Sequence, residues 1–337
     1  MMEILYFVIE ALVKNIVVIA VLMGFVAYVT LAERKILGRI QIRFGPNRVG
    51  PYGLLQPIAD GIKSFVKEDV IPANADKPLF VLAPMISLFT MLCIFGVIPF
   101  GGTVHLFGRA VKLVIGDIDT GLLFVFAFAT LGEYGIVLGG WSSGNKYGVL
   151  GSLRAAAQMI SYEVSLGLIT MGTIILAGSL RLTDIVEAQR HMWFVVYQPF
   201  AFILYLVAGL AEMNRTPFDM PEAESELACG FNIEYSSMKF ATFYISEYTH
   251  MVAVSAIAAT LFLGGWLGPF PSLPGLGPLW FFIKVCVLVF VFIWERGTFP
   301  RLRYDQIMQF GWKVLLPLAL ANTVVTAFLN AMGWLKI

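Results

Sequence analysis

The sequence predicts an all-α integral membrane protein with eight transmembrane helices and one interfacial amphipathic helix after the first. The mean hydropathy of the 337 residues is +0.81, 58% of them are hydrophobic and only 13% are charged. Soluble domains carry about 25% charged residues. The composition therefore excludes a disordered chain and argues against an ordinary soluble enzyme. The net charge of +1 gives no indication of a nucleic-acid partner.

Eight apolar segments have the length of a membrane span, which needs about 20 residues. The segment from Leu79 to Val104 contains no charged residue, and the segment from Val314 to Leu335 is nearly as clear. Runs that are this long and do not alternate favour helices over the strands of a β-barrel. The expected spans are roughly 8–31, 79–100, 118–140, 157–178, 195–212, 241–265, 279–295 and 313–334. Residues 1–337 are expected to form a single polytopic membrane domain.

The distribution of basic residues predicts the orientation of these spans. Of the 23 Lys and Arg residues, 16 lie in the loops on one side and five lie on the other side. The richer side is expected to be cytoplasmic, which places both termini in the periplasm of a bacterial inner membrane. No basic region precedes the first apolar stretch, so we expect a retained span rather than a cleaved signal peptide. The cytoplasmic loops would be 32–78, 141–156, 213–240 and 296–313.

The first cytoplasmic loop contains an expected amphipathic helix at about 52–68. Its apolar residues recur at helical spacing: Leu54, Leu55, Ile58, Ile62, Phe65 and Val66. Its opposite stripe is polar: Gln56, Asp60, Lys63 and Lys67. Such a helix lies along the membrane interface rather than across it. It either anchors the loop to the surface or forms a wall of a cavity that is open to lipid.

Several acidic side chains fall inside expected spans, where charge is costly and usually faces protein or water. Glu133 and Glu163 are too deep to reach the interface, and Glu247 lies in the inner third of its span. Glu133 and Glu163 either handle protons in a polar bundle interior or have a purely structural role.

Three further ionisable residues lie nearer the outer ends of the spans. Glu10 and Lys14 are spaced i,i+4 and are expected to form an interfacial ion pair. Lys284 either extends its ammonium to the outer interface or has a functional role.

The loop over 212–240 is unusually acidic for the basic side. Its first part contains one base, Arg215, and six acids: Glu212, Asp219, Glu222, Glu224, Glu226 and Glu234. Helix capping can account for Asp219 and Glu222, but it leaves the other acids unexplained. Clustered carboxylates raise one another's pKa, so the segment could hold and release protons near neutral pH. The alternative is an acidic docking loop for a basic partner.

The complementary bases follow the first and the seventh span. They are Arg34, Lys35, Arg39, Arg43 and Arg48 in the first loop, and Arg296, Arg301 and Arg303 in the last. They bind either lipid phosphates or another protein. The glycines and prolines over 44–51 make a turn-rich loop that suits a protein contact.

Cysteine and histidine give no metal-binding pattern. The three cysteines and the three histidines are far apart in the sequence, and no CxxC occurs. We therefore expect no metal site.

The polar loops nevertheless resemble a known family. Residues 32–35, 45–51 and 54–57 resemble the quinone-chamber membrane subunit of respiratory complex I, the proton-pumping NADH:quinone oxidoreductase. This is the H subunit of the bacterial complex and the counterpart of mitochondrial subunit 1. Three more stretches carry the same resemblance: 158–163, 212–235 and 300–306. Together they extend from the first span to the last.

The resemblance implies a translocase subunit that has no redox centre and is inactive alone. Ubiquinone or menaquinone would be the substrate, and this chain would bind no FMN, Fe–S cluster or haem. The expected partners are peripheral-arm subunits that carry the terminal Fe–S cluster and quinone pocket, antiporter-like and small membrane subunits, and lipid.

The resemblance also assigns roles to particular residues. Residues that line or dock the quinone chamber would be Arg34, Arg43, Asp60, Arg296 and Arg301. Residues of a proton relay would be Glu163, Glu212, Asp219, Glu222, Glu224, Glu226, Glu247 and Glu133. Two alternatives remain: a homologous subunit of a membrane-bound hydrogenase or a ferredoxin- or F420-driven complex, and a stand-alone proton-coupled transporter. The absence of an inverted repeat argues against the transporter.

Overall fold

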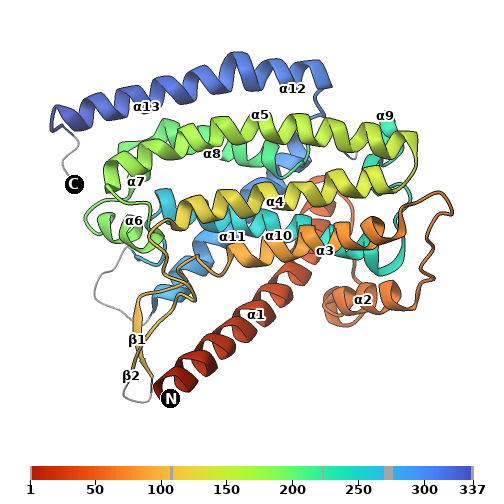
Figure 1. The fold of residues 1–337 in the computed structure, drawn as a ribbon, viewed down its shortest axis with the longest axis horizontal. Helices are drawn as coiled ribbons and strands as arrows, with labels where there is room; N and C mark the ends of the chain where they lie inside the picture. The colour runs from red at the N-terminus through yellow and green to blue at the C-terminus, as the bar shows by residue number, and fades with distance from the viewer. Residues whose placement is uncertain (1, 107–108, 222–223, 269–275, 335–337) are drawn as a thin grey trace.

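Long helices that run back and forth between two ends of the molecule make up most of the chain (Figure 1). The computed structural model describes residues 2–106, 109–221, 224–268 and 276–334. The long helices are α1 (Met2–Ile40), α3 (Lys77–Ile94), α4 (Gly121–Ser142), α5 (Lys146–Ala177), α10 (Ser237–Phe262) and α11 (Gly277–Thr298). The last helix joins α12 (Tyr304–Phe310), a π-helical turn (Gly311–Leu315) and α13 (Leu316–Ala331).

Shorter elements cluster at the two ends of the bundle. At one end, called here the charged end, lie α2 (Gln56–Val66) and α9 (Glu224–Leu227) (Figure 1). At the other, the hairpin end, lie α6 (Leu182–Ala188), α7 (Phe194–Tyr197) and a hairpin of β1 (Thr103–Leu106) and β2 (Arg109–Lys112). The strands are antiparallel, with Thr103 opposite Lys112. This short hairpin was not predicted.

The prediction of a multi-pass all-α membrane protein is confirmed. Within the described residues, seven helices are long and apolar enough to cross a membrane. The fifth expected span, 195–212, is the one that does not form a single long helix, because it is divided into α7 and α8 (Pro199–Glu212). Pro199 has no N–H to continue a helix from α7, and Gln198 breaks the helical geometry with φ −133° and ψ 59°. At 14 residues α8 is about 21 Å long, so the count of eight crossings stays a prediction.

Several helices extend beyond the expected span edges. The first helix continues past residue 31 to Ile40, and α5 begins at Lys146 rather than near 157. The side chain of Asn145 caps α5 by accepting a 2.9 Å hydrogen bond from Tyr147 N. At the other end α5 stops at Gly178, whose φ of 68° suits glycine. Hydropathy detects only the part of a helix that faces lipid. The polar extensions of α1 and α5 were therefore not predicted.

Small residues allow α3, α4 and α5 to pack closely. A methyl group at Gly135 of α4 would lie 2.8 Å from the carbonyl oxygen of Ala83 in α3. A methyl group at Gly140 would lie 2.5 Å from Cβ of Ser152 in α5. Close approach of this kind is typical of helix packing in membranes. It places polar side chains of neighbouring helices within reach of one another.

The most deeply buried of the described spans is α10, because 89% of its apolar window is covered by the rest of the chain. Near its middle it nevertheless carries Glu247, Tyr248 and His250. Charges and polar groups in such a position need partners. The helix therefore fixes where a polar site must form.

Lys284 of α11 turns into the bundle rather than out to the interface. Its Nζ donates hydrogen bonds of 2.5, 2.9 and 2.6 Å to the carbonyl oxygens of Leu263, Gly265 and Leu267. It also lies 4.5 Å from the ring centroid of Trp193. The buried ammonium thus satisfies carbonyl groups just beyond the C-terminus of α10.

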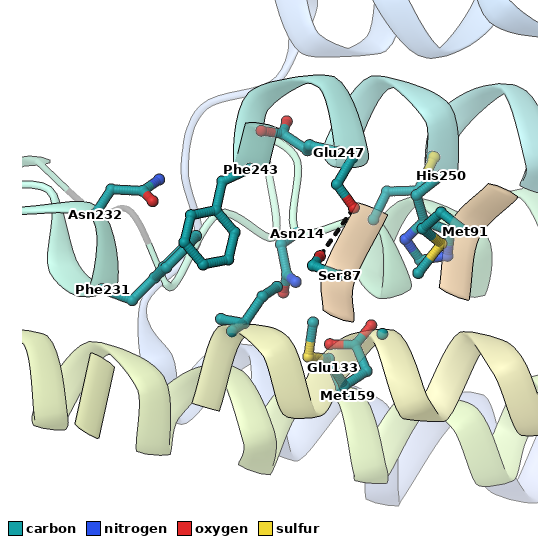
Figure 2. Close-up of a pocket in the computed structure, with 14 residues that line it drawn as sticks. Ser87, Met91, Glu133, Met159, Asn214, Phe231, Asn232, Phe243, Glu247 and His250 are labelled. Carbon is teal, nitrogen blue, oxygen red and sulfur yellow. Dashed lines mark hydrogen bonds between the residues drawn. The ribbon is translucent and has the colours of Figure 1, made fainter. Parts of the chain in front are cut away.

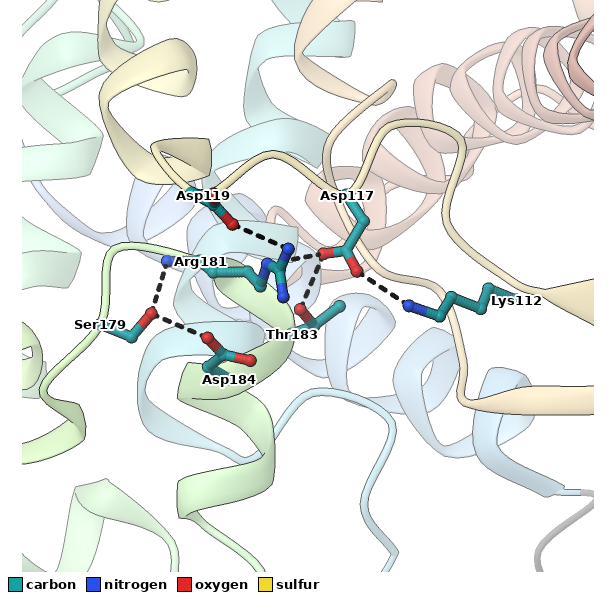
Figure 3. Close-up of polar contacts among 7 residues, drawn as sticks. All are labelled: Lys112, Asp117, Asp119, Ser179, Arg181, Thr183 and Asp184. Atoms are coloured by element: carbon teal, nitrogen blue, oxygen red, sulfur yellow. Dashed lines mark hydrogen bonds and ion pairs between the residues drawn. The ribbon is translucent and has the colours of Figure 1, made fainter.

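A polar cluster ties the hairpin to α6 at the hairpin end (Figure 3). Asp117 accepts a 2.8 Å hydrogen bond from Thr183 and lies 3.2 Å from Lys112 Nζ and 3.5 Å from Arg181 Nε. Partial burial opposes ionisation of Asp117, but these hydrogen bonds and positive charges outweigh it and hold its pKa below its usual value. The ionised carboxylate therefore stabilises this end of the fold.

Asp117→Asn should lower thermal stability, because it removes the negative charge that pairs with Lys112 and Arg181. The loss should be about 1 kcal/mol or less, as for other partly exposed pairs. Since the pKa of Asp117 is lowered in the folded state, its contribution is present above the unfolded pKa and is lost as the pH falls through the folded pKa. The difference in thermal midpoint between variant and wild-type complexes should therefore shrink in acid. Asp119→Asn is the matched control, because Asp119 is 87% exposed and binds only Arg181 among these residues. An equal loss in both variants would contradict this interpretation.

Candidate functional site

A polar cavity of about 660 Å³ opens at the charged end, between α1, α2, α10 and the loops that follow α8 and α11. Its walls are largely apolar along α1 and α10. Its charged lining residues include Arg34, Asp60, Asp219, Arg296 and Arg301. The sequence analysis assigned four of these to a quinone chamber and Asp219 to the relay. The structure brings all five to one cavity.

The helix α2 forms a wall of this cavity through its polar face. Arg34 Nη1 of α1 lies 2.6 Å from Asp60 Oδ2, and Gln56 donates a 3.0 Å hydrogen bond to the other oxygen of Asp60. The apolar side chains on the far face, such as Ile58 and Ile62, are 56% and 59% exposed. A helix with this division lies at an interface and faces lipid on its apolar side.

On the other side of the cavity, the loop that follows α11 contacts the acidic loop that follows α8. Arg301 Nη2 lies 2.8 Å from the buried Asp219 carboxylate. Next to this pair, the backbone N–H of Leu302 donates a 3.1 Å hydrogen bond to Pro217 O. The two loops therefore move together or break these contacts.

Beneath the cavity, Arg215 is the centre of a buried charge network. Its Nη1 donates a 2.7 Å hydrogen bond to Glu33 Oε2, and its Nε lies 2.8 Å from Glu247 Oε1. Its guanidinium also lies 4.1 Å from the ring centroid of Tyr248. Burial alone would lower the pKa of Arg215, but Glu247 and Glu33 outweigh burial and raise it well above its usual value. Arg215 therefore stays charged.

Glu33 connects this network to the cavity. Its second oxygen, Oε1, accepts a hydrogen bond from Arg296 Nη1, and Arg296 lines the cavity. The side chain of Glu33 is only 3% exposed. One carboxylate is thus shared between a buried guanidinium and one that faces the cavity.

Glu247 connects the same network to a second, smaller pocket (Figure 2). This carboxylate pocket, of about 40 Å³, lies between α3, α4 and α10 and is lined by Glu133, Glu247, His250 and Asn214. The Oε2 atom of Glu133 and the Oδ1 atom of Asn214 have no hydrogen-bond partner among the described residues. The pocket contains these polar atoms and is large enough to hold water that would bridge them.

Two further acids extend from this pocket toward α5. Glu212, the last residue of α8, lies 3.8 Å from His250 Nε2. Glu163 of α5 accepts a hydrogen bond from Thr130 Oγ1. The carboxylates of Glu133, Glu163 and Glu212 are close enough for mutual electrostatic repulsion.

Gln158 positions the start of the acidic loop over these groups. Its buried Nε2 donates hydrogen bonds of 2.6 and 2.7 Å to the carbonyl oxygens of Ala211 and Phe218. The described part of this loop is therefore anchored to α5 on both sides of Arg215.

The remaining predicted site residues lie elsewhere. Arg43 does not line the polar cavity, and its Nε donates to Gln41 in the turn-rich loop. Glu226 forms a surface ion pair of 2.6 Å with Arg154, so its assignment to the buried relay is not supported by its position. Glu222 lies outside the described residues, as does the side chain of Glu224.

Sequence analysis missed Glu33, Arg215 and His250 as members of the site. Glu33 is the acid that directly precedes the basic run after the first span, and Arg215 is the single base among six acids. Each is a single charge whose sign is opposite to that of the charged residues near it in the sequence. Such a charge indicates a buried ion-pair partner. No sequence signal distinguished His250. Among the described residues no group of His, Cys, Asp and Glu is arranged to hold a metal ion.

Comparisons with known proteins agree with the resemblance of the loops. The family model described as NADH dehydrogenase matches residues 13–327. A protein of Geobacter metallireducens, named as an H subunit of NADH-quinone oxidoreductase, is 52% identical over 324 residues, which cover 96% of this chain and 95% of that protein. Proteins with the same name from Paramagnetospirillum magneticum and Syntrophotalea carbinolica are 52% and 54% identical over 92% of this chain, and the matches cover 89% and 93% of their own length. The chain therefore belongs to the NADH dehydrogenase family, among the H subunits of complex I.

Proposed function

We propose that this chain builds the membrane side of a quinone-reduction chamber and transmits the effect of quinone reduction to buried carboxylates that transfer protons. The observation that carries this proposal is the position of Glu247. It pairs with Arg215 of the network below the polar cavity, and it also lines the carboxylate pocket. A charge change in the cavity therefore has a short, contiguous route into the membrane.

The polar cavity suits an amphiphilic substrate such as ubiquinone or menaquinone. Met23, Val26 and Ile245 offer an apolar wall for a tail, while the arginines and aspartates offer hydrogen bonds to a headgroup. Reduction of a quinone to a quinol takes up two electrons and two protons. The electrons would come from the terminal Fe–S cluster of a peripheral-arm subunit. We propose that this chain binds no FMN, Fe–S cluster or haem and is inactive alone.

Competition for guanidinium groups would couple the two sites. Negative charge that develops on the quinone during reduction would attract Arg296 and Arg301 and weaken their pairs with Glu33 and Asp219. Glu33 could then shift toward Arg215, which would loosen the Arg215–Glu247 pair. A carboxylate that loses a positive neighbour becomes easier to protonate, so proton affinity in the carboxylate pocket would rise. By linkage, protonation of the pocket would in turn favour the reduced quinone.

The proposed relay runs from Glu247 through His250 to Glu212, Glu133 and Glu163. Rearrangement of the 212–234 loop would be the two-state element that coupling requires. The two hydrogen bonds of Gln158 limit how far the loop can move, because they fix it on both sides of Arg215. The switch would then consist of side-chain re-pairing more than displacement of the loop.

Eight crossings are the topology that we propose. A methyl group at Gly172 of α5 would contact the amide of Gln198 at the start of α8, and Gln158 of α5 bonds to Ala211 near the end of α8. The short helix thus spans the depth of α5 between these contacts. Both termini would then lie at the hairpin end, the periplasmic side of a bacterial inner membrane, as the distribution of basic residues predicts.

The proposed protein partners are peripheral-arm subunits at the charged end and antiporter-like and small membrane subunits beside the bundle. Ile42 and Phe44 next to Arg43 are 96% and 94% exposed. Apolar side chains that project among arginines suit a protein interface. Arg43 would therefore act in docking rather than as a lining residue.

Arg301→Gln should reduce quinone reductase activity of the assembled complex. The change removes a guanidinium from the cavity, and with it the ion pair between Arg301 and the buried Asp219 carboxylate. A loss of about tenfold corresponds to about 1.4 kcal/mol, which is typical for a hydrogen bond to a charged group. Activity per assembled complex, measured in membranes, tests this.

The matched control is Arg303→Gln two residues away. Its side chain is 77% exposed and pairs with Asp305, so activity should stay near wild type. Equal activities in the two variants at normal complex content would show that Arg301 has no role in the chamber.

Glu163→Gln and Glu212→Gln should each impair proton transfer while the complex still assembles. Glutamine keeps the size and hydrogen bonding of glutamate but cannot titrate. It is also easier to bury than a charged glutamate, so a purely structural glutamate should tolerate the change. Quinone reduction and proton translocation are measured together in sealed vesicles.

Glu226→Gln serves as the comparison, because Glu226 belongs to the same acidic loop but pairs with Arg154 at the surface. It should retain wild-type reduction and proton yield. Wild-type yields in the Glu163 and Glu212 variants as well would rule out the relay.

A further inference from the structure

A second, almost wholly apolar groove lies at the hairpin end, where α1 diverges from the bundle toward its N-terminus (Figure 1). It has a volume of about 520 Å³ and is lined by α1, α10, α11 and the segment that follows β2. No residue that lines this groove also lines the polar cavity. The groove is therefore separate from the proposed quinone chamber.

Aromatic rings close the inner part of the groove. Phe25 of α1 meets Phe282 of α11 edge to face, with ring centroids 5.0 Å apart, and Phe281 meets Phe100 at 5.7 Å. Next to Phe25, Val26 lines the polar cavity and is only 2% exposed. Packing of α1 against the bundle at this level thus separates the two spaces.

A pair of opposite charges stands where the groove opens at the hairpin end. Lys14 Nζ lies 2.7 Å from Glu10 Oε1, and both residues line the groove. Their side chains are 23% and 49% exposed. Such a partly exposed i,i+4 pair is weak, so each group is free to bind an external charge instead. The ligand that fits has an apolar chain and a headgroup with one charge of each sign.

We propose that this groove binds an acyl chain of a zwitterionic phospholipid, with the phosphate at Lys14 and the headgroup ammonium at Glu10. From Lys14 to Phe25 the helix rises about 17 Å. This is close to half of the ~30 Å hydrocarbon core, the depth that an acyl chain of one leaflet reaches. An anionic lipid would leave Glu10 facing like charge, which makes a phosphatidylethanolamine-type headgroup the better match.

Photo-crosslinking in the assembled complex tests this directly. A benzophenone amino acid replaces Val17, which lines the groove, or Ile16, which is 65% exposed on another face of α1 and does not line it. The complex is irradiated in vesicles with equal amounts of phosphatidylethanolamine and phosphatidylglycerol. At Val17 the phosphatidylethanolamine adduct should exceed the phosphatidylglycerol adduct several-fold, whereas at Ile16 the two should be equal.

The two headgroup contacts predict different changes in labelling at Val17. Lys14→Gln should lower labelling at Val17 by both lipids, because both carry the phosphate, and should keep the preference for phosphatidylethanolamine through Glu10. Glu10→Gln should shift the preference toward phosphatidylglycerol, because the lysine is then unopposed. Neither change should affect labelling at Ile16. A quinone adduct, an adduct with another subunit, or equal labelling at both positions would overturn the proposal.

Retained lipid provides a second measurement if the probe at Val17 prevents assembly. Purified wild-type complex should keep a phosphatidylethanolamine that Val21→Trp expels, because Val21 also lines the groove. Ile16→Trp should keep it. Equal retention of phosphatidylethanolamine in the three complexes, measured by mass spectrometry, would overturn the proposal as well.

Discussion

The arrangement of the site depends on the free-energy cost of burying the guanidinium of Arg215. Arg215 is 2% exposed and lies where no solvent can compensate its charge, so it must be paired within the protein. Glu33 of α1 and Glu247 of α10 pair with it, and Tyr248 covers its face. This requirement brings two spanning helices and the acidic loop to one point.

Glu33 and Glu247 each take part in more than one contact, and they thereby connect the polar cavity to the carboxylate pocket. Glu33 is held by one arginine that faces the polar cavity and by another that is buried, while Glu247 belongs both to the buried pair and to the carboxylate pocket. A change in charge at one end can therefore alter pairing at the other without any large movement. Gln158 holds the intervening loop in place, which favours re-pairing of side chains as the physical basis of coupling.

Hydropathy and helical periodicity predicted the membrane class, the long spans and the amphipathic helix, because lipid imposes an apolar surface that is visible in the sequence. They missed the extensions of α1 and α5, which are helical but polar, and the break at Pro199 that shortens α8. Glu133, Glu163, Glu212 and Glu247 were identifiable because acids inside apolar segments need a special reason. The role of His250 depends on contacts between residues that are far apart in the chain, and no local pattern indicates these.

The most direct test is the infrared difference spectrum of the complex upon quinone reduction, recorded for wild type, Glu133→Gln and Glu247→Gln. Reduction should change the band of protonated carboxyl groups in wild type, because proton affinity rises in the carboxylate pocket. This change should be weakened in Glu133→Gln, which removes a titrating group, and in Glu247→Gln, which removes the connection to Arg215. An identical carboxyl signal in all three complexes would contradict the account.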